Sequence, residues 1–361
     1  MNAPALLGAR PILITGGAGF IGCNLADRLA RDGAHVVLYD SLSRAGTERN
    51  AEWLMKRHPD RVALFEADIR DEAALKLAVS NATAVFHFAA QVAVTTSFRD
   101  PAEDFAVNVG GTFALLEAIR RREHAPPLVF ASTNKVYGDL NDLALIEEKD
   151  CYLPRERAIR ANGASEAQPL DFHTPYGCSK GAADQYALDY ARSFDLPVAV
   201  MRMSCIYGPH QMGGEDQGWV AHFLIRALRE EPITIFGDGK QVRDILYVDD
   251  AVDAYVAAWR NIERVKGRAF NLGGGPANAV SLRTLLAFIE GRLGRRLDIR
   301  YEEWRPGDQR YYVSNTQAAE RALGLGKPTP WREGVAKLMD WLSADLGSLP
   351  QTSLALREAA A

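Results

Sequence analysis

The stretch PILITGGAGFIG, residues 11–22, decides the fold that the sequence predicts. Its apolar first half is typical of a buried strand. After it, Ile21, Leu25 and Leu29 recur at the spacing of one helix face. The stretch therefore predicts a strand, a glycine turn and a helix in immediate succession.

The glycines of this turn indicate a ligand that contains phosphate. Gly16 permits a tight turn, Gly19 lets the backbone approach a pyrophosphate, and Gly22 lets the helix pack closely on the strand. The N-terminus of the helix then offers unpaired N–H groups to phosphate oxygens. A lone glycine triplet is more often an ordinary turn, so a dinucleotide site needs support from elsewhere in the chain.

A carboxylate at the end of the next predicted strand gives this support. Residues 35–40 predict a strand that ends at Asp40, 18 residues after Gly22. Asp40 is placed to accept hydrogen bonds from the adenosine ribose hydroxyls and to repel a 2′-phosphate, which favours NAD over NADP. Arg44 could instead pair with a 2′-phosphate, although a solvated arginine, or one stacked on adenine, is the interpretation we favour.

Strand-like runs alternate with amphipathic helical stretches along the first two hundred residues. The runs after residue 40 are 61–66, 83–88, 127–132 and 196–203, and the segments between them suit crossover helices. This alternation predicts an α/β protein with a doubly wound parallel sheet of the Rossmann type.

After residue 203 the pattern breaks up into loops marked by glycines. Alternation returns only at 242–246 and 268–272. We therefore expect a smaller, discontinuous substrate-binding lobe toward the C-terminus, laid over the strand ends. The expected division is a NAD-binding domain of residues 1–203 with 240–274, a lobe of 204–239 with 275–346, a lid-like connection at 139–173, and a frayed tail at 347–361.

Composition limits the class of partner and the compartment. Charged residues make up 24% of the 361 residues and the net charge is −4, so nothing indicates a nucleic-acid surface. The four cysteines show no CxxC or His-Cys spacing, so we expect no metal site and no disulfide framework. No stretch is long enough to cross a bilayer and no signal peptide is evident. We expect a cytoplasmic protein without a membrane partner.

A proton-transfer site is predicted around Tyr176. Tyr176 and Lys180 lie four apart in HTPYGCSKGAADQY, residues 173–186, which predicts a helix with both side chains on one face. The ammonium would favour the phenolate, so the tyrosine could take a proton from a hydroxyl and return it. Thr133, at the end of the fifth strand, adds a stiff hydroxyl that can donate and accept, although such a threonine is usually a cap.

Two other strand ends carry candidate cofactor contacts. Asp68 follows the third strand, where it could reach the adenine amino group, and a helix N-cap for residues 70–80 fits equally well. Ala89 and Ala90 follow the fourth strand, where small side chains would let a flat dinucleotide lie against the backbone. Core packing explains these alanines nearly as well.

With these motifs in this order, the chain resembles the extended short-chain dehydrogenase/reductase family of nucleotide-sugar epimerases and dehydratases, from about residue 10 to 345. The glycine turn and the Tyr-x-x-x-Lys pair belong to the whole family. Other stretches resemble a subgroup that inverts carbon 2 of CDP-linked dideoxyhexoses. These are STNKVYGDL (132–140), LDFHTPYGCSKGAADQY (170–186), SCIYG (204–208), EDQGW (215–219), GKQVRDILYVDD (239–250), FNLGGG (270–275) and WRPGDQR (304–310).

The resemblance implies bound NAD, a CDP-linked dideoxyhexose substrate, and Thr133, Tyr176 and Lys180 as the catalytic set. It implies cofactor contacts at Gly16, Gly19, Phe20, Ile21, Gly22, Asp40, Ser43, Arg44, Asp68, Ile69, Ala89, Ala90, Asn108, Tyr176 and Lys180. It implies substrate contacts at Asn134, Lys135, Cys205, Gln217, Gly218, Trp219, Arg243, Arg305 and Asp308. It also implies a homodimer that forms through two helices of each subunit, one of them the Tyr176 helix.

Two of these positions bear on the diphosphate of the substrate. Arg243 and Arg305 carry guanidinium groups, which offer paired donors to phosphate oxygens. Cys205, three residues before Gly208, departs from the asparagine that many UDP- and dTDP-sugar relatives carry there. This departure puts the usual contact between asparagine and diphosphate in doubt.

Three alternative functions stay open. A sugar 4,6-dehydratase would use the same triad, but those relatives carry Asp-Glu where this chain has Asn134 and Lys135. A UDP- or dTDP-sugar 4-epimerase would differ only in the sugar carbon that faces nicotinamide. A non-catalytic NAD-sensing protein could keep the glycine turn without Thr133, Tyr176 and Lys180, so the presence of all three argues against it.

Overall fold

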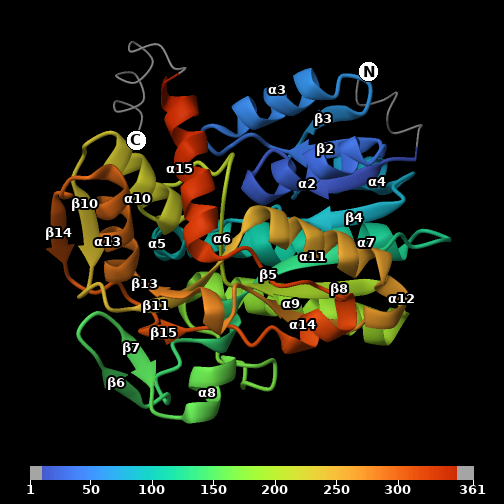
Figure 1. The fold of residues 1–361 in the computed structure, drawn as a ribbon. Helices are drawn as coiled ribbons and strands as arrows, with labels where there is room; N and C mark the ends of the chain where they lie inside the picture. Colours follow the sequence, from blue (N-terminus) through green and yellow to red (C-terminus); the bar gives the residue numbers. More distant parts are fainter. Residues whose placement is uncertain (1–9, 348–361) are drawn as a thin grey trace.

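Seven parallel strands form the central sheet of the computed structural model, which describes residues 10–347. From edge to edge the order is β12-β8-β5-β4-β1-β2-β3 (Figure 1). The strands are β1 Ile12–Thr15, β2 Val36–Asp40, β3 Val62–Glu66, β4 Ala84–His87, β5 Leu128–Thr133, β8 Val198–Met203 and β12 Arg268–Leu272. This confirms the predicted doubly wound sheet. Because the chain order reverses between β1 and β4, ligands are expected outside the carboxyl ends of the strands there.

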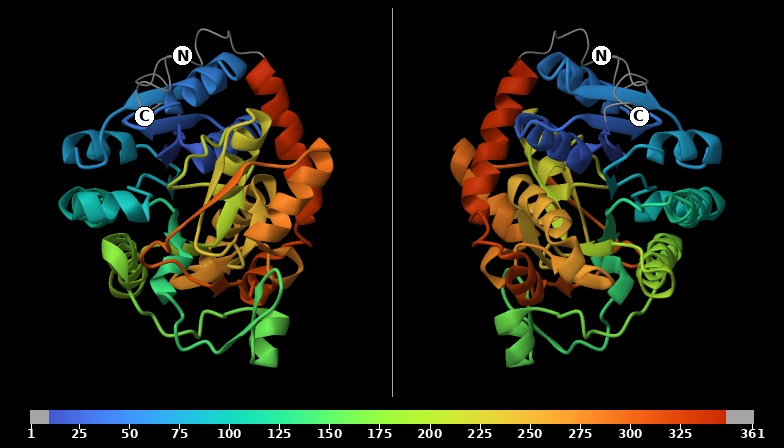
Figure 2. Two further views of the ribbon diagram at one scale, coloured as in Figure 1. Left: turned by 90° about the vertical axis from the view of Figure 1, so that its left-hand side faces the viewer. Right: turned by 90° about the vertical axis from the view of Figure 1, so that its right-hand side faces the viewer.

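Helices cover both faces of this sheet (Figure 2). Strand residues alternate between the layers, so that Ile14 and Leu38 pack under α2, α3, α11 and α14, whereas Leu13 and Val37 pack under α4, α7 and α9. Burial on both faces explains why the strands are continuous apolar runs. The bounds are α2 Phe20–Arg31, α3 Thr47–Arg57, α4 Glu72–Val79, α7 Gly111–Arg120, α9 Thr174–Phe194, α11 Val248–Arg260, α12 Ile262–Val265 and α14 Gln317–Leu323.

Short helical elements lead from the sheet toward its carboxyl edge. Between β4 and α7 the chain forms α5 Val94–Arg99, α6 Pro101–Phe105 and the π-helix η1 Ala106–Gly110. After β5 it forms the 3-10 helix η2 Asn134–Tyr137. A π-helical turn is rare and is frequently found at functional sites.

A smaller lobe with its own core follows residue 203. Its core joins a helical layer to a four-stranded sheet, in which β11 pairs with β9, β13 and β15, and to the pair β10-β14. The elements are β9 Cys205–Tyr207, α10 Trp219–Leu228, β10 Ile233–Phe236, β11 Val242–Tyr247, η3 Pro276–Asn278, β13 Ala279–Ser281, α13 Leu282–Leu293, β14 Ile299–Glu302, β15 Tyr311–Tyr312 and α15 Trp331–Gly347.

The division between the two parts differs in detail from the expected one. We placed residues 240–274 in the NAD-binding domain, but β11 pairs only with strands of the small sheet among the described residues. We placed residues 275–346 in the lobe, but α14 packs on α11 and β12 of the central domain. Apolar periodicity predicts that a strand or a helix is present. It does not show which sheet the strand pairs with or which domain the helix packs against. The expected frayed tail lies outside the described residues apart from Gly347, which ends α15.

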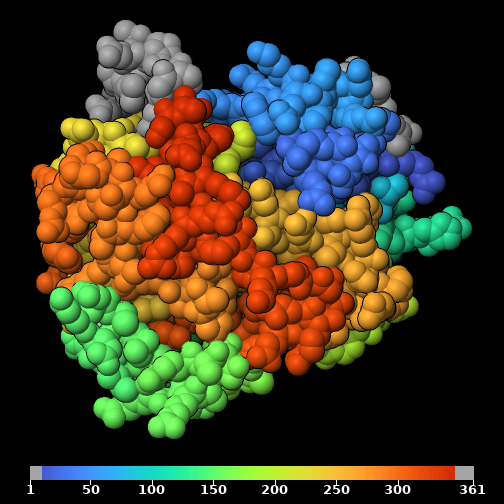
Figure 3. All heavy atoms as spheres, in the orientation of Figure 1, coloured from blue at the N-terminus to red at the C-terminus, as the bar shows by residue number. Residues whose placement is uncertain are grey.

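Helix α15 links the lobe to the central domain. It runs along the face shown in Figure 3, and its Trp341 ring lies 5.1 Å from the His210 ring. Arg49 of α3 donates to Asp345 at 3.1 Å. Within residues 10–347, no helix combines the length and the apolar character that a membrane span requires.

The long connection at 139–173 is not placed as a lid. It forms the hairpin β6 Leu145–Glu147 and β7 Tyr152–Pro154 and the helix α8 Arg157–Asn162, at the bottom of the molecule in Figure 1. Tyr152 N donates to the Lys240 carbonyl at 3.0 Å, and Ala164 bridges to Ser314. Of its residues, all described, none lines either of the two cavities of the site.

Candidate active site

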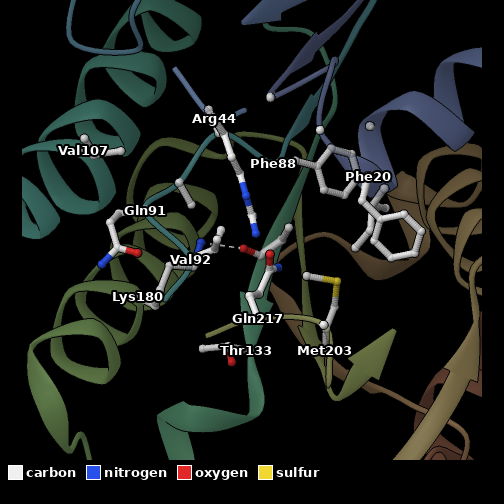
Figure 4. Close-up of a pocket in the computed structure, with 18 of the residues that line it drawn as sticks. Phe20, Arg44, Phe88, Gln91, Val92, Val107, Thr133, Lys180, Met203 and Gln217 are labelled. Atoms are coloured by element: carbon white, nitrogen blue, oxygen red, sulfur yellow. Dashed lines mark hydrogen bonds between the residues drawn. The ribbon is translucent and has the colours of Figure 1, made fainter. Parts of the chain in front are cut away.

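A cavity of about 550 Å³ opens at the carboxyl edge of the central sheet (Figure 4). Its wall begins at the glycine turn after β1 and continues past Asp40, which ends β2, and Asp68, which follows β3. At its other end lie Thr133, Tyr176 and Lys180. The sequence motifs from five separate segments therefore meet in one cavity, at the position where the strand order reverses.

The glycine turn has the geometry that the sequence predicts. Gly16 has φ +69°, and a Cβ on it would lie 2.6 Å from the backbone nitrogen of Ala89. A Cβ on Gly22 would overlap the Gly16 carbonyl oxygen, so this glycine packs the helix against the turn rather than the strand. Gly19 caps α2 without a side-chain hydrogen bond. The first N–H groups of α2 are therefore left for a ligand.

Asp40 joins the end of β2 to this turn. Its two carboxylate oxygens accept hydrogen bonds from Ala18 N and Leu42 N, each at 3.0 Å. Burial raises the pKa of the carboxyl, and these backbone donors oppose the shift. The carboxylate lies on the cavity wall, and its oxygens keep lone pairs that could accept from a ribose.

The segment after Asp40 lines the same wall. Ser43 and Arg44 both face the cavity, as expected. Figure 4 shows the Arg44 side chain extending into the cavity rather than away from it, and burial lowers its pKa. Arg44 is exposed to solvent, so the solvated arginine and the arginine stacked on adenine both remain open interpretations.

The helix-cap alternative for Asp68 is wrong. The N-cap of α4 is Asp71, whose side chain accepts from Ala73 N and Ala74 N. Asp68 instead accepts from Arg70 Nε at 2.8 Å and Nη2 at 2.7 Å, and this pairing lowers the pKa of the carboxyl. Asp68 and Ile69 both line the cavity.

Asn108 lies behind the wall rather than in it. Ala89 and Ala90 line the cavity as expected, but Asn108 is buried and does not. Its side chain accepts from Gln91 N at 2.9 Å and donates to Gln91 O at 3.1 Å and to Ser179 Oγ at 2.9 Å. We therefore correct the expected cofactor contact. Asn108 holds the backbone at Gln91 against α9, the helix that carries Tyr176 and Lys180.

The structure brings the three predicted catalytic residues together. Thr133 ends β5, where its hydroxyl accepts from Lys135 N at 3.2 Å, and Tyr176 of α9 lines the same cavity. Lys180 lies one turn further along α9 and is 4% exposed. Its Nζ donates to the Ala131 carbonyl oxygen at 2.7 Å (Figure 4). Hydroxyl, phenol and ammonium thus line one end of the cavity.

The electrostatics of this pair differ from the expectation. Burial raises the pKa of Tyr176 to about 12, with a contribution from Asp104, and only the neighbouring Thr133 hydroxyl opposes the shift. Burial lowers the pKa of Lys180 to about 8, against Asp184 and Asp104. We expected the ammonium to lower the tyrosine pKa, but it is directed at the Ala131 carbonyl.

A second cavity of about 290 Å³ adjoins the first on the side of the small lobe. The two share lining residues, so they form one continuous site. The shared predicted residues are Asn134, Lys135, Cys205, Gln217, Gly218 and Trp219, and Arg243, Arg305 and Asp308 line the second cavity. All nine predicted substrate contacts therefore lie on its wall.

Polar contacts fix several of these side chains. Arg243 Nη2 donates to Asp308 at 2.7 Å. The Arg305 guanidinium lies 3.6 Å from the Phe236 ring centroid. Trp219 Nε1 donates to Cys205 Sγ at 3.4 Å, and burial raises the pKa of that thiol. The position held by asparagine in many relatives is here a neutral thiol turned toward tryptophan.

The model of the NAD dependent epimerase/dehydratase family matches residues 12–273. The chain belongs to this family. It is 40% identical to the CDP-paratose 2-epimerase of Salmonella typhi over 342 residues, which are 92% of this chain and 99% of that protein. The solved UDP-glucose 4-epimerase of Thermotoga maritima with UDP-glucose has a TM-score of 0.79 and 29% identity, over 96% of this chain and 100% of that one. The Thermus thermophilus UDP-glucose 4-epimerase complex with NAD has a TM-score of 0.77 and 30% identity, over 94% and 100%.

Membership makes the protein an NAD-dependent enzyme, and the first cavity fits that cofactor. A turn without side chains and an open helix N-terminus suit a pyrophosphate. The Asp40 carboxylate suits a ribose diol, and the small Ala89 and Ala90 leave room for a flat ligand. Gly16, Gly19, Asp40 and Lys180 are the residues that we expect to hold NAD in this family member.

The sequence did not indicate several residues of the site. Gln91, Met203 and Gln211 line the first cavity, and Gln91 and Met203 are labelled in Figure 4. Asp104 is buried beside the catalytic helix, where Gln91 Nε2 donates to it at 3.0 Å. An acidic residue near the start of a helix is usually a capping residue, so only the position of Gln91, directly after Ala90, carried a signal.

Proposed function

We propose that the protein inverts carbon 2 of a CDP-linked dideoxyhexose, converting CDP-paratose to CDP-tyvelose. The observation that carries this proposal is the 40% identity to a CDP-paratose 2-epimerase over nearly the full length of both proteins. When bound, NAD supplies a hydride acceptor that becomes the hydride donor, and its positive charge also favours a phenolate nearby.

The three residues of the catalytic set have different roles in proton transfer. Thr133 and Tyr176 both line the same end of the cavity, so we expect one substrate oxygen to contact both hydroxyls. With a pKa of about 12, Tyr176 holds its proton at neutral pH, which suits return of a proton to that oxygen. Taking the proton requires a lower pKa, which the Thr133 hydroxyl and, when it is bound, the positive charge of NAD would favour.

The residues after Thr133 argue against loss of water. A 4,6-dehydratase needs an additional acid and base at this position. Here Asn134 Nδ2 donates to Gln309 Oε1 at 3.1 Å and Lys135 Nζ donates to the Gly307 carbonyl at 2.8 Å. Neither is a carboxyl group. A UDP-sugar 4-epimerase stays the second candidate, because two solved enzymes of that class share the fold and 29% and 30% of the sequence.

The test is incubation of the purified protein with CDP-paratose, UDP-glucose and dTDP-glucose, followed by NMR of the recovered sugars. Inversion at carbon 2 of CDP-paratose alone is the expected result. Conversion of UDP-glucose to its carbon-4 epimer would establish the second candidate instead. Recovery of every sugar unchanged, with NAD bound, would favour a non-catalytic NAD-sensing protein.

We also propose a homodimer formed through α7 and α9. Phe113 of α7 and Tyr186 and Phe194 of α9 are 45%, 46% and 48% exposed, and large exposed apolar side chains on one surface favour association. The rings of Phe113 and Tyr186 lie 6.0 Å apart. Phe113→Glu should give a monomer in analytical ultracentrifugation, whereas Tyr301→Glu on the lobe should not; an unchanged mass for the first variant would refute this interface.

A cytoplasmic location is part of this proposal. The four cysteines, Cys23, Cys151, Cys178 and Cys205, are all free thiols, which suits a reducing compartment. Detection of the protein in another fraction after cell lysis and fractionation would contradict it.

A further inference from the structure

Lys135 occupies the junction between the two cavities of the site. It belongs to η2, two residues after Thr133, and it lines both the cofactor cavity and the lobe cavity. Its Nζ donates to the Gly307 carbonyl oxygen at 2.8 Å, which holds the side chain across the junction. A ligand that reaches from the lobe to the triad must therefore pass this ammonium.

The charge of Lys135 is the least neutralised of those around the lobe cavity. Three cationic side chains line this cavity, and Arg243 is paired with Asp308 at 2.7 Å. Arg305 lies 3.6 Å from carboxylate oxygens of both Glu215 and Asp216. Lys135 forms no ion pair within 4.0 Å in residues 10–347; burial and the Arg243 charge lower its pKa, and the Asp308 and Asp139 carboxylates oppose this shift from a greater distance. The junction thus favours an anion.

The neighbouring side chain cannot supply this charge. Cys205 also lines both cavities, but its thiol is neutral and accepts a hydrogen bond from Trp219. The position from which many relatives are expected to contact the diphosphate therefore offers neither a cation nor an amide donor. Lys135 lies on the same wall and offers three N–H donors, one of which is used by Gly307.

The chemistry of carbon 2 places an anion at this junction. In a nucleotide sugar the β-phosphate is carried by the oxygen on carbon 1. Carbon 2 is bonded to carbon 1, whereas carbon 4 lies across the pyranose ring from it. If carbon 2 faces Thr133 and Tyr176, the β-phosphate must lie close to them; if carbon 4 faces them, it lies a ring length further away.

We propose that Lys135 binds the β-phosphate of the substrate and so selects carbon 2 for reaction. This inference rests on the proposed function. Lys135 acts here as a specificity-determining residue, because its distance from Thr133 along the wall sets which sugar carbon can reach the triad. Arg243 and Arg305, which line the lobe cavity, are then available to bind the α-phosphate and the nucleoside end of the ligand.

The test measures nucleotide binding by isothermal titration calorimetry, with CDP and CMP as probes. In Lys135→Met, the dissociation constant for CDP should rise about ten- to a hundred-fold, the scale of one charge-assisted hydrogen bond, and that for CMP should change less than about threefold. Lys135→Arg should retain most of the CDP affinity. Lys240→Met is the matched control, because Lys240 pairs with Glu147 and lines neither cavity.

Two results would overturn the inference: unchanged CDP affinity in Lys135→Met, or an equal loss of CDP and CMP affinity. Thermal unfolding and NAD content show whether the variant is folded, and Lys135→Gln serves in its place if Met is not tolerated. The binding test is independent of turnover. If Lys135→Met loses CDP but the enzyme inverts carbon 4, the proposed function fails and the selection of carbon 2 fails with it, while phosphate binding by Lys135 stands.

Discussion

Lys180 Nζ donates a hydrogen bond of 2.7 Å to the carbonyl oxygen of Ala131. This bond ties α9 to β5 two residues before the strand ends at Thr133, so helix and strand present their side chains to the same cavity. The ammonium also lies 4.3 Å from the Phe130 ring centroid. Lys180 is thus held by the strand, and the Tyr176 side chain lines the cavity together with Thr133.

Tyr176→Phe removes the phenol oxygen and keeps the ring. We expect epimerisation to slow by about 10²–10⁴, the usual contribution of a positioned acid and base, while the NAD content of the purified protein stays unchanged. NMR of the sugar measures the first quantity and chromatography of the denatured protein the second. Tyr186→Phe, at an exposed position of the same helix, should have normal activity. Near-normal turnover by Tyr176→Phe would remove this residue from the mechanism.

Asp40→Ala should loosen the retention of NAD. The carboxylate faces the cavity and also holds Ala18 of the glycine turn, so the variant loses both a ribose acceptor and a support of the turn. Wild-type protein purified without added cofactor should release NAD on denaturation, and the variant should release less. Glu66→Ala is the control, because Glu66 is the exposed partner of Asp40 in β3. Release of NADP alone would overturn our interpretation of Asp40.

The sequence predicted the fold and the cavity better than the contacts behind the wall. The seven strands of the central sheet could be predicted because burial on both faces makes each of them an apolar run. Strand β11 is a similar apolar run in the sequence, but it pairs in the small sheet. The role of Asn108 depends on Gln91 and Ser179, which lie 17 and 71 positions away in the chain. Helical spacing brought Tyr176 and Lys180 to one face. The Lys180 ammonium donates to the Ala131 carbonyl, and the spacing of residues along the sequence does not reveal this contact.

The pH dependence should reflect Lys180. Its pKa in the folded protein is about 8, below the ordinary 10.5, so it carries its charge below pH 8 and loses it above. Because we expect the Lys180 ammonium to help hold NAD, kcat/KM should fall as pH rises through about 8. Between pH 8 and 10.5 the unfolded chain binds the extra proton, so through this residue the free energy of unfolding rises with pH.

Asp104→Asn tests this assignment. Asp104 and Asp184 both raise the pKa of Lys180, so removing the Asp104 charge should move the alkaline limb of the kcat/KM profile to lower pH. It should also lower the pKa of Tyr176, since Asp104 raises that value. Asp189→Asn, at an exposed position of the same helix, should leave the profile unchanged. A limb that stays in place in Asp104→Asn would show that Lys180 does not set it.

An isotope label tests the proposed carbon and the division of work within the site. In the proposed reaction, Tyr176 and Thr133 contact one hydroxyl oxygen of the sugar and exchange only the proton on that oxygen with solvent. The hydrogen bonded to carbon 2 should therefore return to the sugar without mixing with water. CDP-paratose deuterated at carbon 2 should give CDP-tyvelose that keeps the label, and unlabelled substrate in heavy water should gain none at that carbon. Mass spectrometry and NMR of the product measure both quantities. Deuterium entering from solvent would instead mean that a general base removes a proton from carbon, and a label retained while carbon 4 is inverted would move the assignment to the 4-epimerases.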